Sequence, residues 1–239
     1  MELKKSIIAI LIIFLCRSSI LAQRVQKLEF DTERVASGSE LYLQVIETAG
    51  RVQKFVSLIE KNIDVKGRLV FVTQKHLQQN GCVDIDSSVA TKKDFSPLYY
   101  SALLNDGTVK EAYRFSKNKV NGTTDNGDGP KIVTYDFGNK KILNAVIQGE
   151  LLKTLNFNES KSHSYLIYNP GKTVLHVTYR IVGEENLSIG GQTISALVVD
   201  MEGALLPTKI WLSKNDQSLM KQCTNLPNGS KFWKKRIWP

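Results

Sequence analysis

Residues 175–181 read Leu-His-Val-Thr-Tyr-Arg-Ile, an alternation of apolar and polar side chains. Successive side chains of a β-strand point to opposite faces, so the leucine, valine, tyrosine and isoleucine share one face. A helix would instead repeat its apolar positions every three or four residues. The segment therefore predicts a strand with one apolar face.

The same period of two recurs along most of the chain, in short segments separated by turn residues. Asp106-Gly107 suits a tight hairpin turn because glycine accepts positive φ. Frequent turn signals with little helical spacing favour an antiparallel meander. We therefore expect a mainly β fold: a single antiparallel curved sheet, or incomplete β-barrel, with one short helical segment. Further strands are expected at residues 41–45, 52–59, 68–74, 98–103, 109–116, 131–137, 193–201, 208–212, 219–223 and 231–238.

The helical segment is expected within residues 143–155. Leu143, Ile147, Leu151 and Leu155 recur at every fourth position and predict one apolar stripe. Gly149 weakens this helix, so it is expected to be short or broken. Packed across the concave face of the sheet, it would be a buried plug or a mobile lid, and we favour the plug.

Residues 121–130 (Asn-Gly-Thr-Thr-Asp-Asn-Gly-Asp-Gly-Pro) are rich in turn-forming residues and predict an exposed loop. Its Asp and Asn side chains resemble calcium ligands. The twelfth-position Glu and the flanking helices of an EF-hand are missing from the pattern, so we expect no metal site.

The first residues have the pattern of a secretory signal peptide. Lys4 and Lys5 precede an apolar run, and small or polar residues follow up to Ala22. The run is too short to span a bilayer. We expect a signal peptide at residues 1–22, a single β-rich domain at residues 23–239, and export to the periplasm or cell envelope.

Two of the three cysteines lie beyond the expected signal peptide. Cys16 would be removed with it, whereas Cys82 and Cys223 would remain. A disulfide between them is possible in an oxidising compartment, and two separate thiols are the alternative. A bridge would make early and late strands neighbours.

No motif in the chain predicts catalysis, metal binding or a cofactor. His76, His163 and His176 have no zinc-ligand spacing, and no GxSxG or phosphate-binding loop occurs. We therefore expect a non-enzymatic protein without cofactors.

The formal net charge of +9 leaves contact with an anionic membrane surface open. In residues 231–238 Lys and Arg alternate with aromatic residues. We interpret this stretch as a strand with one apolar and one basic face, and we expect no nucleic acid partner.

Several short motifs follow one another along the chain. They are residues 94–98 (Asp-Phe-Ser-Pro-Leu), 113–115 (Tyr-Arg-Phe), 149–155 (Gly-Glu-Leu-Leu-Lys-Thr-Leu), 193–201, 210–213 (Ile-Trp-Leu-Ser) and 219–221 (Leu-Met-Lys). Their order resembles an exported bacterial family known as a domain of unknown function, related to the LolA/LolB-like lipoprotein-carrier barrels. The resemblance implies an incomplete barrel with a short helical segment across its concave face.

These observations favour an exported binding protein that holds a lipid, a lipoprotein acyl chain or another apolar ligand in a barrel cavity. Tyr113, Phe115, Tyr179 and Ile210 are the candidate lining residues, and a closed core is the alternative role for them. An envelope assembly protein that binds other proteins is the second hypothesis. An exported hydrolase is the third, and it would need a nucleophile, a base and an orienting group to converge.

Overall fold

The computed structural model describes residues 30–238 apart from 49–50, 65, 126 and 170–172. The expected signal peptide at residues 1–22, and the start of the domain expected at 23–239, lie outside the described residues. Within them no helix is long and apolar enough to cross a membrane.

The described residues form mainly β-strands. The first eight are β1 (Gly38–Thr48), β2 (Arg51–Ile63), β3 (Leu69–Leu77), β4 (Val83–Thr91), β5 (Pro97–Leu103), β6 (Val109–Phe115), β7 (Lys119–Thr124) and β8 (Lys131–Asp136). The remaining seven are β9 (Ile142–Asn144), β10 (Ser162–Asn169), β11 (Thr173–Ile189), β12 (Gln192–Glu202), β13 (Thr208–Ser213), β14 (Leu219–Asn225) and β15 (Lys231–Arg236). Three short 3₁₀ turns, η2 (Thr32–Arg34), η3 (Ala145–Ile147) and η4 (Pro227–Gly229), and one helix, α2 (Gln148–Thr154), complete the fold.

All fifteen strands belong to one sheet. Its order is β8-β7-β6-β5-β4-β3-β2-β1-β15-β14-β13-β12-β11-β10-β9, with every neighbouring pair antiparallel except β9 and β10. We call β1–β8 the N wing and β9–β15 the C wing. The wings join where β1 pairs with β15, from Tyr42 opposite Arg236 to Glu47 opposite Lys231.

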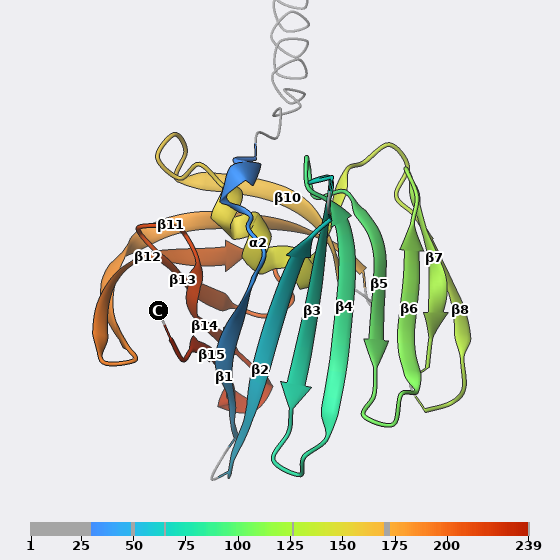
Figure 1. The fold of residues 1–239 in the computed structure, drawn as a ribbon, viewed down its shortest axis with the longest axis horizontal. Coiled ribbons are helices and arrows are strands. Elements are labelled where there is room, and N and C mark those ends of the chain that lie inside the picture. Colours follow the sequence, from blue (N-terminus) through green and yellow to red (C-terminus); the bar gives the residue numbers. More distant parts are fainter. Residues whose placement is uncertain (1–29, 49–50, 65, 126, 170–172, 239) are drawn as a thin grey trace, which may run out of the picture.

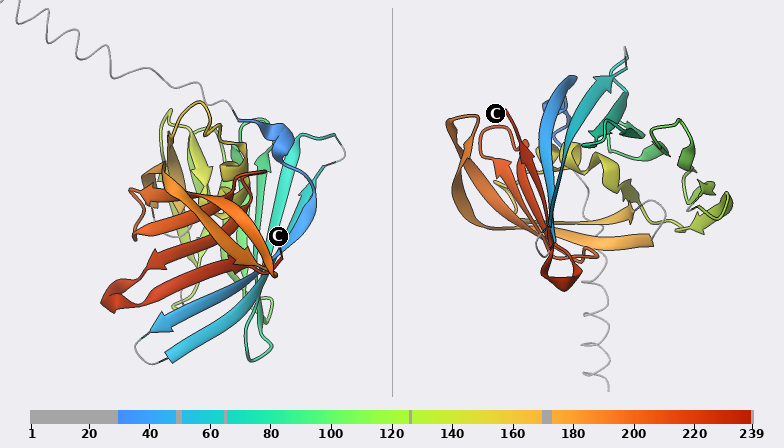
Figure 2. Two further views of the ribbon diagram at one scale, coloured as in Figure 1. Left: turned by 90° about the vertical axis from the view of Figure 1, so that its left-hand side faces the viewer. Right: turned by 90° about the horizontal axis from the view of Figure 1, so that it is seen from below.

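The sheet is strongly curved and does not close, because β8 and β9 remain its two edges (Figure 1). The views in Figure 2 show the wings bending towards each other around the helix. The expected incomplete antiparallel barrel is confirmed, and its early and late strands are neighbours through β1 and β15.

The helical segment lies between the two wings, on the side towards which the sheet curves (Figures 1 and 2). It is shorter than residues 143–155, because β9 takes the first residues and Asn144 caps η3 by accepting a hydrogen bond from the Val146 N–H. Leu143, Ile147, Leu151 and Leu155 are each at most 1% exposed and belong to the main core cluster. The segment is a buried plug.

The loop expected at residues 121–130 begins later than predicted. β7 extends to Thr124, so Asn121-Gly122 lies inside a strand rather than in a turn. A Cβ at Gly122 would lie 2.0 Å from the carbonyl oxygen of Ala112 and 2.7 Å from the ring of Tyr113. This glycine is therefore needed for close approach of β7 to β6.

Candidate functional site

Polar side chains occupy much of the concave face of the N wing. On β1 the inward positions are Glu40, Tyr42 and Gln44, all buried, whereas Leu43 points outward and is exposed. β3 continues inward from Val70 and Val72 to Gln74 and His76. These strands alternate as predicted, but here it is the polar side chains of the alternation that face the interior of the curved sheet.

Two cavities follow this polar surface. One of about 360 Å³ lies beneath residues 145–150 and is floored by β1, β2, β3, β14 and β15. The other, of about 700 Å³, lies towards the hairpin ends of β1–β6. We call them the helix end and the hairpin end of the cleft. They form one continuous cleft because they share the lining residues Gln44, His76, Asp86, Tyr100 and Glu111.

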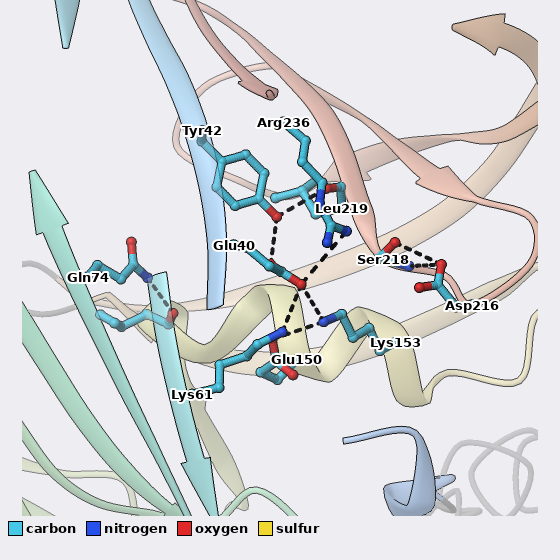
Figure 3. Close-up of polar contacts among 11 residues, drawn as sticks. Glu40, Tyr42, Lys61, Gln74, Glu150, Lys153, Asp216, Ser218, Leu219 and Arg236 are labelled. Carbon is cyan, nitrogen blue, oxygen red and sulfur yellow. Dashed lines mark hydrogen bonds and ion pairs between the residues drawn. The ribbon is translucent and has the colours of Figure 1, made fainter. Parts of the chain in front are cut away.

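A cluster of buried charges closes the helix end (Figure 3). Glu40 Oε1 lies 2.7 Å from the Nζ atoms of both Lys61 and Lys153, and 3.8 Å from Arg236 Nη1. The Glu150 carboxylate lies 3.3 Å from Lys61 Nζ and 3.4 Å from Lys153 Nζ. We call these five residues the charged cluster. It ties α2 to β1, β2 and β15.

The charges of the cluster determine its protonation. Burial alone would raise the pKa of Glu40, but Lys153 and Lys61 outweigh it and lower that pKa to about 2. The Tyr42 hydroxyl donates a 2.7 Å hydrogen bond to Glu40, and burial raises the pKa of this tyrosine. Glu40 is therefore ionised at neutral pH and engaged by its neighbours, which suits a structural anchor rather than an acid–base catalyst.

A chain of hydrogen bonds runs along the wall of the cleft. The Gln44 amide donates to Ser57 Oγ, which lies 2.7 Å from His76 Nδ1. His76 Nε2 lies 3.1 Å from Asp86 Oδ2, and the Tyr100 hydroxyl donates to Asp86 Oδ1 over 3.3 Å. Since the amide donates to Ser57, the serine hydroxyl is free to donate to His76, which in turn donates to Asp86. Every member of the chain is thus held in a fixed orientation.

This chain has the residue types of a hydrolytic triad, but its serine is inaccessible. Ser57 is 0% exposed and does not line either cavity. His76 and Asp86 do line both cavities. The arrangement can present an imidazole and a carboxylate to a bound molecule, while the buried serine positions the imidazole.

The four expected lining residues do not meet in one cavity. Ile210 lines the helix end of the cleft. Tyr179 is 0% exposed and packs in the main core cluster. Tyr113 and Phe115 belong to a second core cluster, where their rings lie 5.9 and 5.5 Å from that of Tyr168. For Tyr113, Phe115 and Tyr179 the alternative role in a closed core holds, because their strands turn their aromatic side chains into packed layers.

Of the two alternatives for Cys82 and Cys223, a disulfide or two separate thiols, the structure has the second: both are free and half-buried. Cys82 immediately precedes β4, and Cys223 lies on β14 opposite Trp233. Four strands separate β4 from β14 in the sheet. Neighbouring strands are about 4.8 Å apart, so five spacings place the two strands roughly 24 Å apart along the sheet, well beyond the roughly 4–7 Å that a disulfide allows between Cα atoms.

Except for Ile210, the residues that line the cleft were missed as candidates in the sequence. Asp84 and Asp86 alternate on β4, a strand that the sequence analysis did not predict, and Gln74 and His76 alternate on β3. The signal in the sequence that could have identified them is a polar residue at every second position, next to segments that are already predicted as strands. In the described part of the chain no three His, Cys, Asp or Glu side chains are grouped to hold a metal ion.

Residues 45–231 match the model of a family described as protein of unknown function (DUF3108). The matched region runs from the middle of β1 to the start of β15, so it includes α2 and most of both wings, while the cleft-lining residues Gln44 and Lys234 lie just outside it. A comparison with curated proteins gives no match. The match confirms the expected resemblance to a domain family of unknown function.

Proposed function

We propose that this chain, which belongs to the DUF3108 family of unknown function, is an exported, non-enzymatic binding protein. Its ligand is a small polar molecule held in the cleft. The observation that carries this proposal is the continuous cleft. Two adjoining cavities share five lining residues, four of which are polar or charged and one of which is Tyr100. A concave site with converging, pre-oriented polar groups is typical of small-molecule recognition.

The chemistry of the wall favours a polar ligand over the acyl chain expected from the sequence. Gln44, His76 and Asp86 would lose hydrogen bonds to water against a hydrocarbon chain, at a cost of a few kcal/mol per unpaired group. A ligand with hydroxyl, amide or ionised groups replaces those bonds. The apolar residues that the acyl chain would need are packed against one another instead.

Binding without catalysis is supported by the environment of Ser57. A nucleophile must reach its substrate, and the Ser57 side chain has no exposed surface. Ser57 also lies in the middle of β2, between Tyr42 and His76 of the adjacent strands. Such a position provides no free backbone N–H pair for an oxyanion. These points weigh against the exported hydrolase.

The proposal that the protein works outside the cytoplasm rests on the signal-like pattern of residues 1–22. A relationship to the LolA/LolB-like carriers is part of the same proposal. Its support is a curved, open sheet with a helix across the concave side, and this is an analogy of fold.

Native mass spectrometry of the protein, purified from the cell envelope of its native host, tests the proposal. Gly149 lines the helix end, and a Cβ added to it would meet no atom of another element within 4 Å, so Gly149→Leu should fill the cavity while Gly149→Ala should leave most of it open. We expect a polar small molecule to co-purify with wild type and Gly149→Ala and to be lost from Gly149→Leu. Repeated absence of any ligand from wild type, or an acyl lipid in its place, would contradict the proposal.

One observation favours the second hypothesis, an envelope assembly protein. Within the described residues β8 pairs on one side only, with β7, and it exposes Ile132 (87%) and Tyr135 (40%). An unprotected strand edge is a surface on which another strand can add. If this edge mediates assembly, light scattering should detect concentration-dependent association of wild type that Ile132→Lys abolishes. Monomers at all concentrations in both proteins would argue against self-assembly through β8.

A further inference from the structure

One cation of the cleft is not used by the charged cluster. Lys234 and Arg236 both point inward from β15, but only Arg236 reaches a carboxylate, at 3.8 Å from Glu40. Among the described residues no carboxylate lies within 4 Å of Lys234 Nζ. Lys234 Nζ lies over the ring of Tyr42, 4.6 Å from the ring centroid. The aromatic face positions the ammonium group without neutralising it.

The neighbours of Lys234 in the sheet are both amides. Gln44 of β1 and Gln222 of β14 pair directly with it, and all three residues line the helix end of the cleft. An ammonium group with three donors therefore lies at the centre of a row of polar side chains on three adjacent strands. Such a row can surround one oxygen-rich group of a ligand.

The local charge balance points in the same direction. Around α2 and β15, Lys61, Lys153, Arg236 and Lys234 contribute four positive charges against the two negative charges of Glu40 and Glu150. The other two carboxylates that line this cavity, Asp86 and Glu111, belong to the part of the lining that is shared with the hairpin end. Burial lowers the pKa of Lys234 to about 8, although Glu40 opposes the shift, so the ammonium form prevails at neutral pH. A half-buried cation without an ion-pair partner is unfavourable in the free protein. An anion in the cleft would relieve that cost.

We propose that Lys234, flanked by Gln44 and Gln222, binds an anionic oxygen group, a carboxylate or a phosphate, of the molecule held in the cleft. This inference rests on the proposed binding function and specifies its ligand class. A lysine ammonium is a point charge without the forked geometry of arginine, so it accepts either anion. The cleft extends from this position to the hairpin end, which leaves room for the remainder of the ligand.

Titration of wild-type protein with sodium phosphate or sodium acetate at constant ionic strength, followed by ¹H–¹⁵N NMR, tests the inference. We expect saturable shifts of the backbone amide signals of Gln44 and Gln222. Lys234→Met and Lys234→Gln should weaken binding about tenfold or more, since each removes a charge-assisted hydrogen bond. Lys235→Met is the matched control, because it removes the same charge from the exposed face of the same strand. Its dissociation constant should stay within about twofold of wild type.

The outcomes separate this inference from the proposed function. Response to phosphate alone assigns a phosphate group to the ligand, and response to acetate alone assigns a carboxylate. Absence of saturable shifts in wild type, or equal binding by the Lys234 and Lys235 variants, overturns the role of Lys234. If Gly149→Leu nevertheless displaces the co-purified ligand, the cleft still binds a molecule through other groups. Dispersed amide signals in both Lys234 variants verify that they are folded.

Discussion

The two wings of the sheet use the same alternation of side chains for opposite purposes. On β11–β13 the inward residues include Val177, Tyr179, Val199 and Leu212, each 0% exposed and packed in one cluster with the leucines of the helical segment. On the N wing, the inward positions farther from the helix are Gln44, His76 and Asp86, which line a cleft. The C wing and the helix thus pack into a core together with apolar residues of the N wing such as Val70 and Val72, and the N wing alone adds a row of inward polar groups beside that core.

Stability and recognition are separated within one continuous sheet. Apolar packing contributes about 1.5–3 kcal/mol for each large side chain buried, and it is concentrated under α2. Polar groups in the cleft contribute little to folding, because their hydrogen bonds replace bonds to water. The charged cluster lies at the border, where its partners come from both wings and from the helix.

The largest effect is expected at this border. Glu40→Gln removes the charge that compensates Lys61, Lys153 and Arg236, and breaking a buried ion pair costs about 3–5 kcal/mol of unfolding free energy. Urea unfolding followed by circular dichroism measures this loss. Glu60→Gln, which breaks the exposed pair with Lys75, is the control and should cost under about 1 kcal/mol. Equal losses in the two variants would show that the cluster does not anchor the wings.

Packing under the helix is tested by Leu151→Ala. Leu151 is 1% exposed in the main core cluster, and truncation of a buried leucine costs about 2–5 kcal/mol. The same urea unfolding experiment measures the change, once with the co-purified ligand bound and once after its removal. A loss below about 1 kcal/mol, accompanied by altered ligand retention, would reassign the helical segment as a lid.

Low pH should destabilise the charged cluster before it affects the apolar core. The pKa of Glu40 falls from 4.5 to about 2 on folding, so its stabilisation is complete above pH 4.5 and is lost as the pH falls towards 2. The shift corresponds to up to about 3 kcal/mol. Unfolding free energies measured across this range should decline accordingly. Asp94→Asn removes another carboxyl whose pKa is lowered to about 2, and most of the decline should persist in it.

The smallest effect is expected in the wall of the cleft. Ser57→Ala removes the hydroxyl between Gln44 and His76 and should cost about 1–2 kcal/mol, because two polar partners must find other bonds. Thermal unfolding compares it with Ser39→Ala, an exposed residue of β1 that should change stability by less than about 0.5 kcal/mol. A loss as large as that of Leu151→Ala would erase the distinction between wall and core.

The sequence predicts strands well where one face is apolar, as on β11, and the short helical segment where leucines recur at helical spacing. Periodicity identifies the residues that share a face, but it does not say which face is buried. On β15 the sequence suggested one apolar and one basic face. Instead Phe232 and Lys234 both point inward, while Trp233 and Lys235 both point outward.

The cleft could not be predicted from the sequence for the same reason. A polar residue at an inward position has the same local pattern as one exposed to solvent, and the two differ only in what the rest of the fold places opposite them. Ser57, His76 and Asp86 come from three strands, and only the register of β2, β3 and β4 brings them together. Strand register over such separations is a property of the whole sheet.

The pairing of β1 with β15 has a consequence for the order in which the protein folds. Apart from the parallel pair β9–β10, each wing is a series of hairpins between strands close in sequence, so its contacts can form early. The seam from Tyr42–Arg236 to Glu47–Lys231 joins strands from opposite ends of the described chain, and closing so long a loop is slow and entropically costly. The cleft draws residues from both sides of that seam, including Gln44 and Lys234. We therefore expect the binding surface to assemble late in folding, with β1 an open edge until β15 pairs with it.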